Sequence, residues 1–424
     1  MASVKFAPIL LLSLSLTSLA LHAGGPLIIS GPDGHTPVRY QDPTIILHAE
    51  GGDLGTRTND QADALVDDAI SLWNAVSSSA LRLQINQDSL DFDINISNFE
   101  TYLPSTDNSD LNEDDSYNPI VYDEGGAIID AYFGAGASES VIGVAASVSE
   151  TGLEYFIEGY AVINGRDDLG PGNTPLSDNL LKLLIAHEIG HFFGLDHSQT
   201  NISNQESDFS QPFLCQSAGQ EDYALMYPFI CRETVSLHAD DSSAISALYP
   251  SSDVDEQFGI LQGNFLDENN NALLGANIWA ENVTTGTAIS IVSDYLLQRN
   301  GFYRLYLPPG DYTLHANSIN TLFTGASGVG PYSNSLSDAS FTSPHPIGKV
   351  DYLGTSDNQV AVLTIAANQT REITFNTLGQ FVEGSANTAD DDDSLADLFG
   401  STSIITILLL STGLLGLRRI SSSA

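Results

Sequence analysis

Three histidines and one glycine have a spacing that directs several side chains toward a single point. In the segment HEIGHFFGLDHS, at residues 187–198, His187 and His191 are four positions apart, so they project from one face of a helix, one turn apart. Gly194 follows, and a glycine in the left-handed conformation is a common helix end. We expect the chain to turn there and to bring His197 back toward the other two histidines.

Three imidazoles in this arrangement are the ligand set of a catalytic zinc ion, because three protein ligands leave the fourth position to water. Glu188 follows the first ligand, close enough to serve as general base without binding the metal. The alternative is a helix with incidental histidines. However, a chain with 9 histidines in 424 residues contains the whole pattern by chance with a probability on the order of 10⁻⁵. We therefore predict one zinc ion held by His187, His191 and His197, with Glu188 as the catalytic residue.

The segment, with Ser198 after the third histidine, resembles the zinc signature of the matrixins, a group of metzincin peptidases. The sequence ALMYP, at residues 224–228, is similar to the family's turn that places a methionine beneath the metal, here Met226. This resemblance implies a zinc metalloendopeptidase that hydrolyses peptide bonds in a protein or peptide substrate. It also implies that the pocket beside the cleaved bond is lined by Tyr227, Pro228 and Phe229.

Two departures from the family limit what the resemblance implies. Vertebrate matrixins are kept latent by a propeptide cysteine, whereas the first cysteine here is Cys215. Their second, structural zinc uses histidines upstream of the active site, but none occurs between His48 and His187. The resemblance therefore supports the catalytic zinc alone.

Alternating strand and helix patterns predict an α+β domain over residues 24–250. Helical periodicity covers residues 62–80 and 180–195, and Ser177 and Asp178 stand at the expected N-cap of the second helix. Residues 155–162 form a predicted strand. We expect this strand to be the sheet edge that pairs with an extended substrate, although an interior strand is the alternative.

After a polar linker at residues 251–256, short strands alternate with turns over residues 257–378, which predicts an all-β sandwich. The sequences LGA at residues 274–276 and LPPGDYT at residues 307–313 resemble those of carboxypeptidase regulatory-like domains. Such domains usually serve as spacers or binding modules. We assign no chemistry to this one.

The two ends indicate export. Residues 1–23 are typical of a signal peptide, with a lysine before an apolar stretch and small residues at the end. Residues 379–397 form an acidic linker, and residues 398–424 contain an apolar stretch followed by two arginines. This tail is either a single membrane span or a sorting tail that resembles the PEP-CTERM and GlyGly-CTERM kinds of bacterial surface proteins. We expect a secreted or cell-surface protein that contacts the membrane through its tail.

Export would place both cysteines of the chain in an oxidising compartment. A disulfide between Cys215 and Cys231 would close a loop of 17 residues and contribute about 3 kcal/mol by restricting the unfolded chain. Two buried free thiols are the alternative.

A net charge of −41, from 13 basic and 54 acidic residues, argues against a nucleic-acid-binding protein. Calcium is a weaker hypothesis than zinc, because a solvated acidic loop is favoured for the carboxylates that would bind it. These carboxylates are Asp107, Asp110, Asp114, Asp115 and Asp123. Two other functions stay open: a surface adhesion or binding protein with an inactive peptidase domain, and a zinc hydrolase of non-peptide amides. The sequence predicts no oligomeric state.

Overall fold

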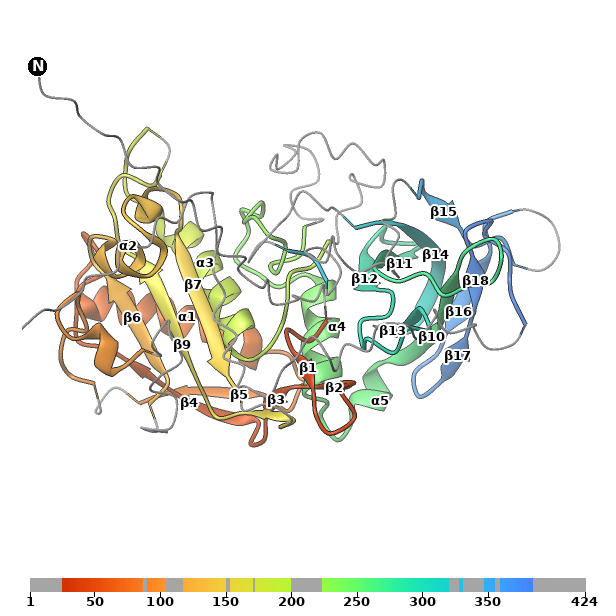
Figure 1. The fold of residues 1–424 in the computed structure, drawn as a ribbon, viewed down its shortest axis with the longest axis horizontal. Coiled ribbons are helices and arrows are strands. Elements are labelled where there is room, and N and C mark those ends of the chain that lie inside the picture. Colours follow the sequence, from red (N-terminus) through yellow and green to blue (C-terminus); the bar gives the residue numbers. More distant parts are fainter. Residues whose placement is uncertain are drawn as a thin grey trace, which may run out of the picture.

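The computed structural model describes residues 25–86, 90–103, 117–149, 153–170, 172–199, 223–319, 328–330, 347–354 and 359–383. These residues form few helices and many strands in several sheets, in agreement with the predicted α+β class. The strands β4, β5, β6, β7 and β9 and the helices α1 to α3 lie on one side of the molecule, and the strands from β10 onward lie on the other (Figure 1). The short strands β1 and β2 lie in the middle, near α4 (Figure 1).

A five-stranded sheet forms the centre of the first unit, in the order β5-β4-β6-β9-β7. Four strands run parallel, and β7 is antiparallel to its neighbour β9. In this order the strands are β5 (Arg82–Ile85), β4 (Thr44–Ala49), β6 (Pro119–Asp123), β9 (Glu158–Asn164) and β7 (Gly143–Val148).

The prediction that residues 155–162 form the sheet edge is wrong. This segment is divided between β8 (Tyr155–Phe156), which pairs with β3 (Arg39–Tyr40), and β9, which pairs with β6 on one side and β7 on the other. Residues 159–164 are all buried, as is typical of a strand covered on both faces. The edge strand next to α3 is β7 instead.

Helices cover both faces of this sheet. The helices α1 (Asn59–Asn74) and α3 (Asp178–Phe192) pack on one face, and α2 (Ala127–Phe133) packs on the other. Helix α1 ends six residues before the predicted 62–80 segment does, because the Asn74 side chain exchanges hydrogen bonds of 2.8 and 2.9 Å with the Leu83 backbone. An asparagine engaged in this way favours the end of a helix.

Short elements complete the first unit and lead into the second. The short elements are β1 (Ile29–Ser30), β2 (Thr36–Pro37), η1 (Phe99–Thr101), η2 (Ala137–Glu139), α4 (Ala239–Leu248) and α5 (Val254–Gln257). Helix α5 begins inside the segment at residues 251–256 that was predicted to be a polar linker, so this linker is partly helical.

The second unit consists of two sheets with an apolar core between them. One sheet contains β13 (Phe302–Leu307), β10 (Gly259–Leu266), β17 (Thr370–Glu372) and β18 (Phe375–Asn376). The other contains β12 (Ala288–Val292), β11 (Ala276–Asn282), β14 (Gly310–Ser318), β15 (Val350–Asp351) and β16 (Val362–Ile365).

Helix α4 joins the two units, and Figure 1 shows it between them. It contacts β12 and β13 of the second unit. The Ser290 backbone N–H donates to Asp240 Oδ1 at 2.6 Å, and Ser243 Oγ donates to the Tyr306 carbonyl at 2.8 Å. The two units therefore share hydrogen bonds as well as a connecting chain.

The segments expected to direct export, at residues 1–23 and 398–424, lie outside the described residues, as do residues 384–397 of the acidic linker. Among the residues that are described, no helix is long and apolar enough to cross a membrane.

Candidate metal centre

The structure brings the three predicted histidine ligands together. Helix α3 begins at Ser177, whose hydroxyl accepts from the Leu180 N–H, so the predicted N-cap is confirmed. The chain turns at Gly194, where φ is +106° and a Cβ would lie 2.8 Å from Phe156 Cε2. Only glycine satisfies both conditions. The turn places His197 next to the two helical histidines, and the donor atoms of all three lie within 4.8 Å of one another.

The hydrogen bonds of the three rings define which nitrogen atom carries the proton. Each Nδ1 is paired with a backbone carbonyl: His187 with Leu225 at 2.7 Å, His191 with Leu195 at 2.8 Å, and His197 with Gly328 at 3.2 Å. A carbonyl oxygen can only accept, so each Nδ1 carries the proton and each Nε2 presents a lone pair.

These lone pairs face one another. The Nε2 atom of His191 lies 3.1 Å from the Nε2 atoms of both His187 and His197. Three lone pairs at such distances repel one another unless a cation lies between them. Ligands at 2.0–2.1 Å around a tetrahedral zinc are separated by about 3.3 Å, so the donor set fits such an ion. The structure thus supports a metal site of three buried histidines.

Burial keeps these imidazoles neutral. It lowers the pKa of His187 to about 4 and that of His191 to about 3, and it lowers the pKa of His197 well below the usual value. For His191 and His197, repulsion from the neighbouring imidazoles adds to this effect. Neutral rings are the form that binds a metal.

Glu188 is buried between α3 and the edge strand β7. Its environment raises the pKa of the carboxyl to about 8, because burial outweighs the hydrogen bond from the Ala145 N–H. A Cβ at Gly143 would lie 3.0 Å from both Glu188 Cγ and Oε1, which makes glycine the residue that leaves room for this side chain. The carboxyl group therefore occupies a defined place beside the metal-binding helix.

Met226 lies against the same helix. A Cβ on Gly190 would be only 2.3 Å from Met226 Sδ and 3.2 Å from Trp73 Cζ2. The sulfur therefore packs directly against the helix backbone at Gly190, a residue that lies between His187 and His191 in the sequence. Trp73 is fixed there by its Nε1, which donates to the Ala186 carbonyl at 2.9 Å.

The turn at residues 224–228, which contains Met226 and is here called the methionine turn, is held by Asp241. Asp241 is a buried residue that the sequence analysis missed. Its carboxylate accepts from the backbone N–H groups of Leu225 at 2.8 Å, Met226 at 3.0 Å and His238 at 2.7 Å. The only signal in the sequence is an aspartate in the first turn of a helix, a position common in many proteins.

The residues expected to form the substrate pocket lie at or beside an apolar cluster that both units form. Tyr227 is 2 % exposed and packs its ring 4.8 Å from that of Tyr223, within an apolar cluster that includes residues of the β-sandwich. Phe229 packs against the same cluster and Pro228 is partly exposed. Their role in substrate binding stays a prediction.

Cys231 is buried in the same cluster. Cys231 is disulfide-bonded, so it is not the buried free thiol of the alternative. Its predicted partner, Cys215, lies outside the described residues, so the pairing with Cys215 stays a prediction. Four of the five aspartates considered for calcium also lie outside the described residues. The fifth, Asp123, accepts from the Ile129 N–H at 2.9 Å and is thereby engaged at the start of α2.

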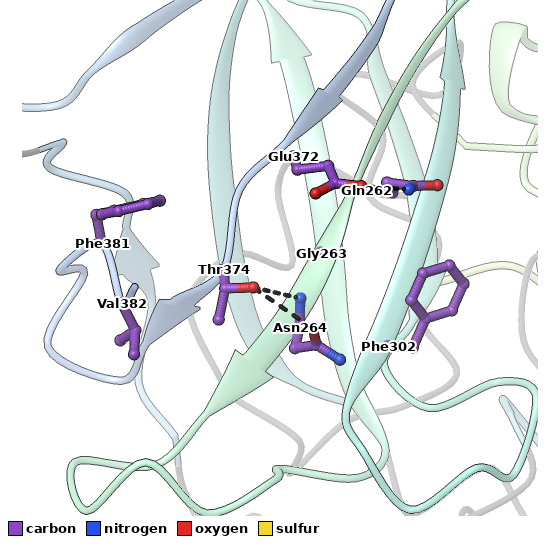
Figure 2. Close-up of a pocket in the computed structure, with 8 residues that line it drawn as sticks. All are labelled: Gln262, Gly263, Asn264, Phe302, Glu372, Thr374, Phe381 and Val382. Atoms are coloured by element: carbon purple, nitrogen blue, oxygen red, sulfur yellow. Dashed lines mark hydrogen bonds between the residues drawn. The ribbon is translucent and has the colours of Figure 1, made fainter. Parts of the chain in front are cut away.

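A separate groove of about 430 Å³ lies on the sandwich. Figure 2 shows Phe302 and Phe381 at its two sides and a polar strip between them. The side chains in the strip bond to one another: Gln262 Nε2 donates to Glu372 Oε1 at 3.1 Å. Because this groove contains one carboxylate and no histidine, it does not compete with the histidine cluster as a reactive site.

No known family matches this chain, and no curated protein is similar to it. The chemistry of the site therefore has to be argued from the geometry of its own residues.

Proposed function

We propose that this protein is a zinc-dependent metalloendopeptidase of the matrixin type. The observation that carries the proposal is the set of three unprotonated Nε2 atoms that face one another beside the buried carboxyl group of Glu188. Three neutral imidazoles with a fourth position open are the ligand set of catalytic zinc, whereas structural zinc sites have four protein ligands.

The residues of the chain would divide the work as follows. His187, His191 and His197 hold the ion, and their Nδ1–H groups, bonded to carbonyls, keep the rings oriented. A bound cation would favour the ionised form of the Glu188 carboxyl, against the effect of burial on its pKa. In that form Glu188 takes a proton from the attacking water and passes it to the departing amine. When bound, zinc would supply Lewis-acid polarisation of the scissile carbonyl and of the attacking water.

The edge strand β7 is the best candidate for holding the substrate. Within the described part of the chain, β7 pairs only with β9, which leaves its other edge available to a further strand. Its Ala145 N–H already reaches Glu188, so a peptide that pairs with this edge lies close to the general base.

Secretion and attachment to the cell surface also belong to the proposal. They depend on the sequence of residues 1–23 and 398–424, which resemble a signal peptide and a membrane or sorting tail. Detergent extraction of the native host's membranes, compared with its culture medium, would locate the protein.

The function is tested by digesting casein or a peptide library with the wild type and with Glu188→Gln, each with and without a chelator. We expect the chelator to abolish cleavage and the substitution to reduce it by at least about 100-fold, because a general base contributes that much or more. The zinc content of Glu188→Gln serves as the control and should equal that of the wild type. Equal cleavage by both proteins, or cleavage that resists the chelator, would refute the mechanism. A zinc-loaded wild type that cleaves no peptide would favour the binding-protein alternative.

A further inference from the structure

A short segment of the sandwich unit lies directly against the third histidine. Residues 328–330 occur between β14 and β15 in the chain, and all three are buried. The Gly328 carbonyl accepts from His197 Nδ1 at 3.2 Å. The Gly330 N–H bonds the carboxylate of Asp196, which also accepts from the His197 N–H at 2.6 Å.

The three histidines differ in where their orienting carbonyl comes from. His187 uses Leu225 and His191 uses Leu195, and both carbonyls belong to the first unit. His197 uses a carbonyl that is 131 positions away in the chain and belongs to the second unit. The Nδ1 partner fixes the tautomer and the ring orientation of a metal-binding histidine. Of the three histidines, only His197 therefore depends on the sandwich for its tautomer and its ring orientation.

Apolar packing keeps this segment in place. Val329 is fully buried in a cluster to which both units contribute, here called the interface cluster. The first unit contributes Tyr223, Tyr227 and Cys231, and the second contributes Leu274, Val292, Ile319 and Val329. One further hydrogen bond crosses nearby, from Gln199 Nε2 to the Ser318 carbonyl at 3.1 Å. Val329 is thus the side chain that ties the segment to the methionine-turn region.

We propose that residues 328–330 are a positioning segment of the metal site, so that the sandwich is a part of this site rather than a spacer. The segment acts through His197: it fixes the ring so that Nε2 faces the other two ligands. Val329 holds the segment against the interface cluster. This inference rests on the metal site of the proposed function, but not on the cleavage of peptides.

The test compares Val329→Ala with Val350→Ala in the full chain. Both remove the same two methyl groups from buried valines of the sandwich, but Val350 lies in the core between the two sheets, outside the interface cluster. Zinc affinity is measured by competition with a chromophoric chelator, and the coordination geometry by the visible absorption of the cobalt-substituted protein. We expect Val329→Ala to bind zinc about 10- to 100-fold more weakly and to show an altered cobalt spectrum, because lost support of a ligand has effects of this size. Val350→Ala should match the wild type in both.

Two results would overturn the inference: unchanged zinc affinity in Val329→Ala, or an equal loss of affinity in both variants. If the affinity is unchanged and Val329→Ala also cleaves peptides faster, the segment covers the site instead of supporting it. The chelator titration reads metal directly, so a wild type that binds zinc without cleaving peptides would refute the proposed function and leave this inference supported by its own measurement.

Discussion

Substituting Gly190 by alanine tests the packing of the methionine turn against α3. In the middle of a helix this change normally stabilises a protein by about 1 kcal/mol. Here the added Cβ would lie 2.3 Å from Met226 Sδ and 2.9 Å from Met226 Cε, well inside contact distance. Met226 and Trp73 are 2 % and 0 % exposed, so neither can move into solvent. Overpacking of this kind costs about 1–3 kcal/mol.

The two effects oppose each other, and overpacking should prevail. We expect Gly190→Ala to lower the free energy of unfolding by about 1 kcal/mol, which is the middle of the overpacking cost less the gain in helix propensity. Met226→Ala alone should cost about 2–5 kcal/mol, as for other buried methionines. In the Met226→Ala background the sulfur is absent, so the Gly190→Ala change should become neutral or stabilising.

The measurement is urea denaturation of all four proteins in the presence of a chelator, so that metal binding does not contribute to stability. The double-mutant cycle should give a coupling of about 1–3 kcal/mol between the two sites, since the residues are in contact. A Gly190→Ala protein that is more stable than the wild type, or an effect that is the same in both backgrounds, would refute the described packing.

Three further predictions concern stability. Burial raises the pKa of Glu50 from 4.5 to about 7, so the folded state keeps a proton that the unfolded chain loses above pH 4.5. The unfolding free energy of the wild type should therefore fall relative to Glu50→Gln by up to about 3 kcal/mol as the pH rises from about 4.5 to 7; parallel curves would contradict this. Asp241→Asn should cost about 1–3 kcal/mol, because an amide cannot replace both carboxylate acceptors in the turn that contains Met226. A denaturation midpoint equal to that of the wild type would disprove the role of this carboxylate. Ser177→Ala should cost about 1 kcal/mol through loss of the cap of α3, whereas Ser177→Thr, which keeps a hydroxyl, should cost less; an equal loss in both would argue against a capping role.

The local part of the site could be predicted from the sequence. The spacing of His187 and His191 fixes their common helix face, and Gly194 supplies the turn that returns His197. Ser177 marks the start of the helix correctly. Each of these features depends on backbone geometry over a few residues, and such geometry is encoded by the residues themselves.

The remaining features depend on residues far apart in the chain. The order of strands in the sheet decides that β7, and not the segment at residues 155–162, is the edge. The burial of Tyr227 and the carbonyl that orients His197 both depend on how the sandwich packs against the first unit. Local patterns of hydrophobicity contain no information on such packing, because any backbone carbonyl could accept the same hydrogen bond.

The hydrogen bond between His197 and Gly328 has a consequence for the order of events during biosynthesis. A ribosome that has just added the third histidine must add 131 more residues before the carbonyl that orients it exists. The nascent chain therefore contains the complete HEIGHFFGLDHS segment long before it contains the support of the last ring. Full metal-binding capacity would be acquired only after the sandwich strands have been synthesised and have docked, and a chain truncated before them would lack it.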